Sequence, residues 1–229
     1  GLGDVYKRQL AGGRNFALAR LNVNGSLDNT FDTDGLVDTD VAGSTDTVND
    51  LALNGTKIVA FGSALNGSNN LDGAVVRYNV NGSLDNTFDT DGKQTVDLLG
   101  KADEFRTGVV QTDGKIIGAG YAYLQGTFYE NFVARLNTNG SADGAFGQGG
   151  KVVLTPGVFP GAIYASALQS DGKLVVVGAT DGFGNTGQDF FVSRYNTDGS
   201  VDVTFGASGL VITDFYASTD IARAVAIQD

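Results

Sequence analysis

The sequence predicts an all-β protein, a β-propeller or a propeller fragment, with about four four-stranded blades. One pattern returns four times at spacings of 57, 58 and 59 residues, and such a period is typical of propellers, solenoids and arrays. Each unit of about 58 residues contains about four apolar runs bounded by Gly, Asn or Asp, which indicate short strands joined by turns. No stretch shows a helical period of 3.6 residues with capping residues.

The composition indicates many turns and few helices. The 229 residues include 34 Gly and only two Pro, and all but two of the 26 acidic residues are Asp. Asp favours turns and caps because its short side chain bonds nearby backbone, whereas Glu favours helices. A compact chain of this mass buries roughly 70% of its unfolded surface, which is enough for a sizeable core.

The clearest repeated segment begins with arginine and ends with phenylalanine. It reads RLNVNGSLDNTF from Arg20, and related copies follow in each later unit. An overlapping stretch, NVNGSLDNTFDTDG at 22–35, returns unchanged at 79–92. The units therefore begin near residues 20, 77, 135 and 194.

Four strand signals recur within a unit. An NG or DG between two apolar runs marks a hairpin. The first strand is apolar on both faces, as a strand packed between two neighbouring blades requires. The first strand is expected at 16–22, 74–79, 132–137 and 191–196, and the second at 151–155 and 210–215. The third is expected at 51–54, 108–111, 166–169 and 224–228, and the fourth at 57–62, 115–120 and 173–179.

One arginine interrupts the first strand of every unit. A charge beside core positions needs a partner, and an Asp follows eight residues later each time. We expect an Arg–Asp pair across the turn, with the guanidinium also bonding backbone carbonyls. A ligand-binding arginine has no need to recur in every blade, so a structural role is favoured. The expected structural residues are Arg20, Asp28 and Phe31; Arg77, Asp85 and Phe88; Arg135, Asp143 and Phe146; and Arg194, Asp202 and Phe205.

These residues resemble the bacterial delta-60 repeat. That repeat reads roughly Arg-Tyr-Asn-x-Asp-Gly-Ser-x-Asp-x-x-Phe-Gly-x-Gly-Gly, with Gln-x-Asp-Gly-Lys-Ile further on. The resemblance covers nearly the whole chain from Leu10 and implies a β-propeller with one repeat per blade. It also implies a secreted or surface-attached bacterial protein, and it transfers no catalytic residues. The first two units depart from the pattern, because they read FDTDG where Phe-Gly-x-Gly-Gly is expected.

The two ends of the chain carry separate expectations. Residues 1–9, GLGDVYKRQ, match nothing later, and we expect a non-native, adapter-like leader there. Residues 10–229 are expected to form a single repeat domain, with a partial unit from Leu10 and a last unit that stops inside a hairpin. Without any Met, the chain is expected to be a piece of a longer protein. Its units either close, with residues 10–12 completing the last blade, or form an arc of a larger ring.

Several kinds of site are excluded by residue type. The chain has no His and no Cys, which removes Ser-His-Asp triads, Cys-His pairs, histidine zinc sites and thiolate metal sites. A net charge of −11 argues against nucleic-acid binding, which requires Lys and Arg to neutralise phosphates. No apolar run approaches the ~20 residues of a membrane span.

Calcium is the best candidate for a bound group, because hard cations prefer carboxylate and carbonyl oxygens. TFDTDGLVD at 30–38 resembles a D-x-D-x-D-G-x-x-D loop, although Thr30 replaces its first acid and Thr95 replaces the last acid of the second copy. An Asx-rich turn explains the same residues and is the favoured interpretation. The candidate calcium ligands are Asp32, Asp34, Asp38, Asp89 and Asp91.

The sequence therefore predicts a non-enzymatic structural or interaction module, which the resemblance to the delta-60 repeat implies is part of a secreted or surface-attached bacterial protein. The expected partners are protein or glycan surfaces. Two alternatives stay open: a calcium-stabilised propeller that binds an extracellular ligand, and a glycan-active enzyme that uses pairs of Asp carboxylates. Apart from calcium in the first alternative, no cofactor is expected.

Overall fold

The computed structural model describes residues 5–8, 14–43, 45–98, 100–123, 129–153, 161–180, 187–216 and 218–228. The described elements are β-strands in antiparallel sheets, one of three strands and three of four. Among these residues, no helix is long and apolar enough to cross a membrane. The sheets consist of β1 (Val5–Arg8), β2 (Phe16–Arg20) and β3 (Leu36–Thr39); β4 (Asp46–Asn54), β5 (Lys57–Leu65), β6 (Leu71–Tyr78) and β7 (Lys93–Val96); β8 (Ala102–Val110), β9 (Ile116–Tyr123), β10 (Tyr129–Leu136) and β11 (Lys151–Val153); and β12 (Gly161–Leu168), β13 (Leu174–Thr180), β14 (Phe190–Tyr195) and β15 (Leu210–Thr213).

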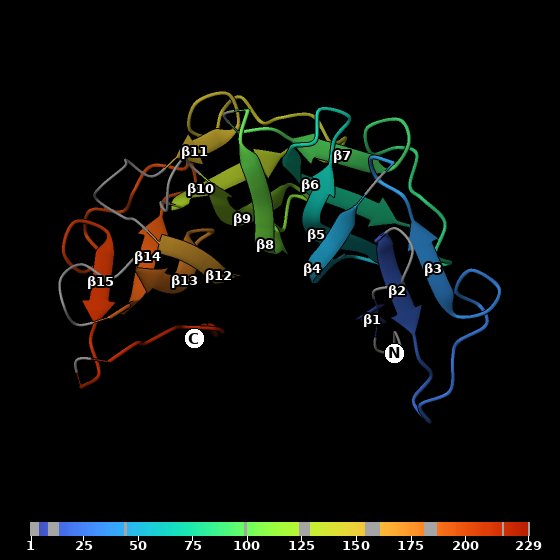
Figure 1. Ribbon diagram of the computed structural model, residues 1–229, viewed down its shortest axis with the longest axis horizontal. Helices are drawn as coiled ribbons and strands as arrows, with labels where there is room; N and C mark the ends of the chain where they lie inside the picture. The colour runs from blue at the N-terminus through green and yellow to red at the C-terminus, as the bar shows by residue number, and fades with distance from the viewer. Residues whose placement is uncertain are drawn as a thin grey trace.

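The four sheets follow one another around an arc, as blades do in a propeller (Figure 1). Strands β4, β8 and β12 lie toward the concave side of the arc, and β3, β7, β11 and β15 lie at its outer side. The first and last sheets lie at opposite ends. The predicted all-β propeller architecture is therefore confirmed, with three strands described in the first blade and four in each of the others.

The boundaries of the sheets do not coincide with those of the sequence units. Each four-stranded sheet starts with the third strand of one unit and ends with the second strand of the next unit. The unit that begins near residue 20 thus supplies β3 to one sheet and β4 and β5 to the next. A repeat period alone defines the length of a blade but not its starting strand, which is why the sequence placed the boundary elsewhere.

Part of the expected leader belongs to the fold. Residues 5–8 form β1 and pair with β2, from Val5 opposite Arg20 to Arg8 opposite Ala17. Excluding these four residues from the fold was therefore wrong, while their adapter-like origin stays a prediction. Residues 1–9 were set apart because their side chains match nothing in the later units. A strand at the edge of a sheet, however, needs backbone pairing more than a particular side chain. The suggested role of residues 10–12 in closing the ring falls outside the described residues.

The hydrophobic cores lie between adjacent sheets. In β5, Ile58 and Ala60 pack toward the preceding sheet, whereas Val59 and Phe61 pack toward the following one. This alternation buries both faces of the strand, because successive side chains point to opposite sides of a sheet. A third core joins the last two sheets and contains Phe146, Ile163 and Phe191 among other residues. Each blade therefore depends on its neighbours for burial.

Candidate functional site

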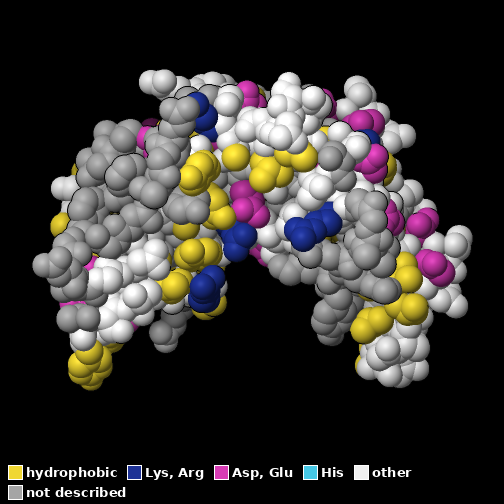
Figure 2. All heavy atoms as spheres, in the orientation of Figure 1, with side chains coloured by type: hydrophobic (Ala, Val, Ile, Leu, Met, Phe, Trp, Pro, Cys, Tyr) yellow, Lys and Arg dark blue, Asp and Glu magenta, His cyan; other side chains and the backbone are white. Residues whose placement is uncertain are grey.

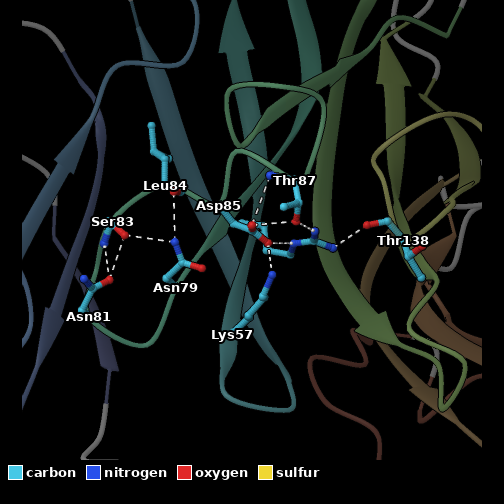
Figure 3. Close-up of polar contacts among 9 residues, drawn as sticks. Lys57, Asn79, Asn81, Ser83, Leu84, Asp85, Thr87 and Thr138 are labelled. Atoms are coloured by element: carbon cyan, nitrogen blue, oxygen red, sulfur yellow. Dashed lines mark hydrogen bonds and ion pairs between the residues drawn. The ribbon is translucent and has the colours of Figure 1, made fainter.

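The structure brings the repeated Arg and Asp residues together. In the second copy, Arg77 Nε donates to Asp85 Oδ2 over 2.6 Å, and both side chains are about 95% buried. Thr87 donates its hydroxyl to Asp85 Oδ1 over 2.7 Å, and the ammonium of Lys57 donates to Oδ2 (Figure 3). The guanidinium also lies 4.8 Å from the centre of the Phe88 ring. Asp85 therefore forms ion pairs with two cations at once.

This arrangement recurs in every unit. The Arg Nε to Asp Oδ2 distance is 2.7–2.8 Å in the other three copies, and each Arg lies 4.6–4.8 Å from the ring centre of its Phe. A lysine joins the pair in two of these copies, at 2.9 Å for Lys115 with Asp143 and 2.8 Å for Lys173 with Asp202. The presence of lysine in the Arg–Asp group was not expected from the sequence. Their recurrence in the Gly-Lys turn, 58 residues apart, is the signal that could have identified them.

The Arg–Asp group also ties one blade to the next. Arg77 Nη1 donates to Thr138 O over 2.6 Å, and Arg135 Nη1 donates to Thr197 O over 2.5 Å. The acceptors belong to the equivalent Asn-Gly or Asp-Gly turn of the following unit. Next to them, Asp89 N donates to Asn139 O over 2.9 Å. Because the contacts cross between blades and recur, the group is a structural connection.

The carboxylates of this group are held in their charged form. The Lys115 hydrogen bond is the main cause that lowers the pKa of Asp143, with further lowering by Ala145 N and Arg135. Burial raises the pKa of Asp85, but the hydrogen bonds from Lys57, Thr87 and Arg77 outweigh it, so the net pKa lies well below its usual range.

The candidate calcium loops adopt a tight turn. Asp32 and Thr33 have φ angles of 44° and 66°, and Asp34 Oδ1 accepts a hydrogen bond from Leu36 N at 2.9 Å. The second copy repeats this geometry, with Asp91 Oδ1 accepting from Lys93 N at 3.0 Å. Asp38 lies on β3, where it accepts a hydrogen bond from Asn15. The five candidate ligands do not meet as a group of three.

Two other groups of three carboxylates do meet within the described part of the chain. In each group, one ligand oxygen from each side chain lies within 4.8 Å of the others. None of these residues was expected from the sequence, because they lie outside the repeated Arg-to-Phe segment and the first acid of each group is 25 residues before the second. The groups are Asp72, Asp97 and Asp103, and Asp189, Asp214 and Asp220.

A different set of side chains lines the inner strands. Each of β4, β8 and β12 contains a bulge, which lies at Asn49, Arg106 and Tyr164. A bulge inserts one unpaired residue and re-aims its side chain. Opposite each bulge the neighbouring strand carries a glycine, and at Gly120 a Cβ would lie 1.9 Å from Glu104 O. No side chain larger than hydrogen fits there, so the glycine permits the bulge. Gly62 and Gly178 are in equivalent surroundings, with 1.8 and 1.9 Å to the facing carbonyl oxygen.

The bulge side chains take part in one polar and aromatic cluster. Arg106 Nη1 donates to Glu104 Oε1 over 3.2 Å, and its guanidinium lies 5.8 Å from the ring centre of Tyr164. Arg223, at the equivalent position of the last unit, lies 4.5 Å from the same ring. Asn49 Nδ2 donates to Glu104 Oε1 over 2.7 Å. Tyr164 is therefore placed between two arginines contributed by different units.

Comparisons with solved structures found partial similarity. The chain is similar to Drosophila Plexin A in complex with Semaphorin 1b, with 16% identity and a TM-score of 0.42 over 80% of this chain. It spans only 36% of that plexin chain. It is also similar to a gluconolactonase from Xanthomonas campestris, with 14% identity and a TM-score of 0.28 over 87% of this chain and 84% of the other. No curated protein matches the sequence.

A comparison with protein families gave a match that repeats along the chain. The matched segments, 3–31, 57–88, 111–146 and 169–205, together cover more than half of the chain. Each of them ends at or next to the Phe that closes the Arg–Asp segment of its unit. The chain belongs to the family described as "Domain of unknown function (DUF5122) beta-propeller".

Proposed function

We propose that the chain is a non-enzymatic interaction module that binds a carboxylate-bearing partner along the inner strands of its blades. One observation carries this proposal. Four equivalent positions at the inner edge hold Asn49, Arg106, Tyr164 and Arg223, whereas the Arg–Asp group between the blades is the same in every unit. Variation at the inner edge on a constant framework is what a recognition surface requires.

The chemistry of these positions favours an anionic partner. The protein carries a net charge of −11, yet basic side chains gather along the concave margin of the arc (Figure 2). Arg223 is exposed, and among the described residues no carboxylate forms an ion pair with it. Arginine binds carboxylates through two parallel hydrogen bonds, and a tyrosine ring offers a stacking surface beside it.

The setting of the module is also a proposal. The resemblance to the delta-60 repeat supports a secreted or surface-attached bacterial protein. The absence of His and Cys from the sequence supports binding over catalysis, because the most common acid–base and nucleophilic residues are missing.

Binding to defined polymers tests the proposed function. The intact chain is titrated with polygalacturonate, alginate and poly-glutamate, and with dextran as a neutral polymer. We expect binding to a carboxylate polymer that weakens at least tenfold in the R106A/R223A variant, with an unchanged melting temperature. The matched control is R14A, because Arg14 is an exposed arginine that lies just before β2, away from the bulge positions. Equal binding of dextran, or full binding by R106A/R223A, would refute the proposal, and cleavage of a polymer would favour the enzyme alternative.

A further inference from the structure

Three carboxylates meet where two blades join. Asp72 is the second residue of β6, Asp97 follows β7, and Asp103 lies on β8 of the next sheet. One oxygen from each lies within 4.8 Å of the others. Two of the three side chains are almost fully buried, because Asp103 is 0% and Asp72 is 7% exposed. Three negative charges at such distances repel one another strongly in a buried site.

Each carboxylate uses one oxygen for a hydrogen bond that orients it. Asp103 Oδ2 accepts from Leu98 N at 2.6 Å, Asp97 Oδ1 accepts from Gly100 N at 2.6 Å, and Asp72 Oδ2 accepts from Asn66 Nδ2 at 2.9 Å. Hydrogen bonds of this kind position the side chains that ligate a metal.

The remaining oxygens of the two buried carboxylates have no partner. Oδ1 of Asp72 and Oδ1 of Asp103 are buried without a hydrogen bond. A buried acceptor in this state is costly, and a buried carboxylate oxygen especially so. Burial, together with the charges of Asp97 and Asp72, raises the pKa of Asp103 to about 7. Lys151 is the basic residue that acts on Asp103, but its ammonium donates to the backbone oxygen of Asp97. The carboxylates therefore lack a direct cationic partner among the described residues.

We propose that Asp72, Asp97 and Asp103 bind a calcium ion that links the second and third blades. Calcium accepts six to eight oxygen ligands in flexible geometry, and the exposed Asp97 leaves room for water to complete the shell. Magnesium demands a stricter octahedron and gives up its water reluctantly, so calcium fits a partly buried site better. With three carboxylates, we expect a dissociation constant of about 10⁻⁴–10⁻³ M, the range of extracellular calcium modules.

The same arrangement occurs a second time beside the last sheet, where Asp189 precedes β14 and the other two acids follow β15. Asp189, Asp214 and Asp220 form the equivalent group. Asp220 Oδ2 accepts from Phe215 N at 2.7 Å, as Asp103 does from Leu98 N, and Asp189 Oδ1 is buried without a hydrogen bond. At the junction between the third and fourth blades, the positions equivalent to Asp72 and Asp103 are Glu130 and Gly161, so at least one of the three acids is missing there. The described residues thus contain two such groups, and the equivalent positions Asn15 and Gly161 interrupt the group at the other two junctions.

Calorimetry on the full chain tests this proposal. Protein freed of metal with a chelator is titrated with calcium chloride, and we expect two binding events with weak or no response to magnesium chloride. D103N should remove one event and D103N/D220N both, while D113N, which changes an exposed acid outside the groups, should keep both. In D103N the melting temperature without calcium should be unchanged or higher, because the substitution removes repulsion and asparagine still accepts from Leu98 N.

Three results would overturn the proposal. The first is no heat and no shift in melting temperature at 10 mM calcium chloride, about ten times the weakest expected dissociation constant. The second is full calcium binding by D103N/D220N. The third is loss of binding in D34N/D91N, which would place calcium in the doubled turn. If D103N fails to fold, D97N serves in its place, because Asp97 is exposed.

Discussion

Replacing Asp85 with alanine is expected to lower the free energy of unfolding by about 4 kcal/mol. Removing one member of a buried ion pair typically costs about 3–5 kcal/mol, because the other charge is left uncompensated. Arg77 meets this condition, since its side chain is only 5% exposed. Lys57 is 34% exposed and Thr87 is exposed, so water can replace Asp85 for both and they add little.

Urea unfolding followed by far-UV circular dichroism measures this loss, because the chain contains no Trp. The matched control is D113A, which removes an exposed turn acceptor 3.1 Å from Lys115 N and should cost about 0.5–1 kcal/mol. The double variant R77M/D85A should lose less than the sum of the two single variants, because no unpaired charge remains. A loss for D85A no larger than that for D113A would refute the view that Asp85 holds the blades together.

Two further predictions concern the framework. Gly120→Ala should destabilise the third sheet by about 3 kcal/mol or abolish folding, since its Cβ would lie 1.9 Å from Glu104 O; Gly144→Ala, with no atom within 4 Å, should be nearly neutral in the same urea assay. Stability should also fall in acid, because the folded pKa of Asp143 lies below its ordinary value of 3.8. The contribution is fully present above about pH 4 and is lost as the pH drops through the folded pKa, so K115M should flatten the acid limb of a pH titration of the unfolding midpoint.

Much of the framework could be predicted from the sequence, because it depends on residues that repeat. Arg77 and Asp85 keep the same spacing as their counterparts in every unit. A pair that repeats in each blade has a simple physical reason, because an arginine beside core positions needs an acidic partner. The carboxylate groups could not be predicted in this way. Asp72 and Asp103 are 31 residues apart and belong to neighbouring sheets, so only the packing of the blades brings them together.

The doubled turn has a structural explanation that needs no bound ion. Asp32 and Asp34 have the spacing of a calcium loop, but Asp32 has a φ of 44° and Asp34 accepts a hydrogen bond from Leu36 N. Asp tolerates the left-handed conformation better than most residues, which is sufficient reason for its presence. The corresponding position in the third unit is Gly147, with a φ of 54°. Backbone geometry therefore explains the substitution of Asp for Gly without a ligand.

The two most similar units also separate the framework from the proposed recognition surface. They share fourteen consecutive residues at 22–35 and 79–92, and their Arg–Asp groups have nearly the same geometry. Yet the bulges that follow these segments differ: Asn49 follows the first segment and Arg106 follows the second. Because Gly62 and Gly120 fix the bulge through backbone geometry alone, its side chain can vary without changing the fold. If the proposed function holds, these equivalent positions in successive blades are where differences in binding can accumulate without a change in the backbone of the blade.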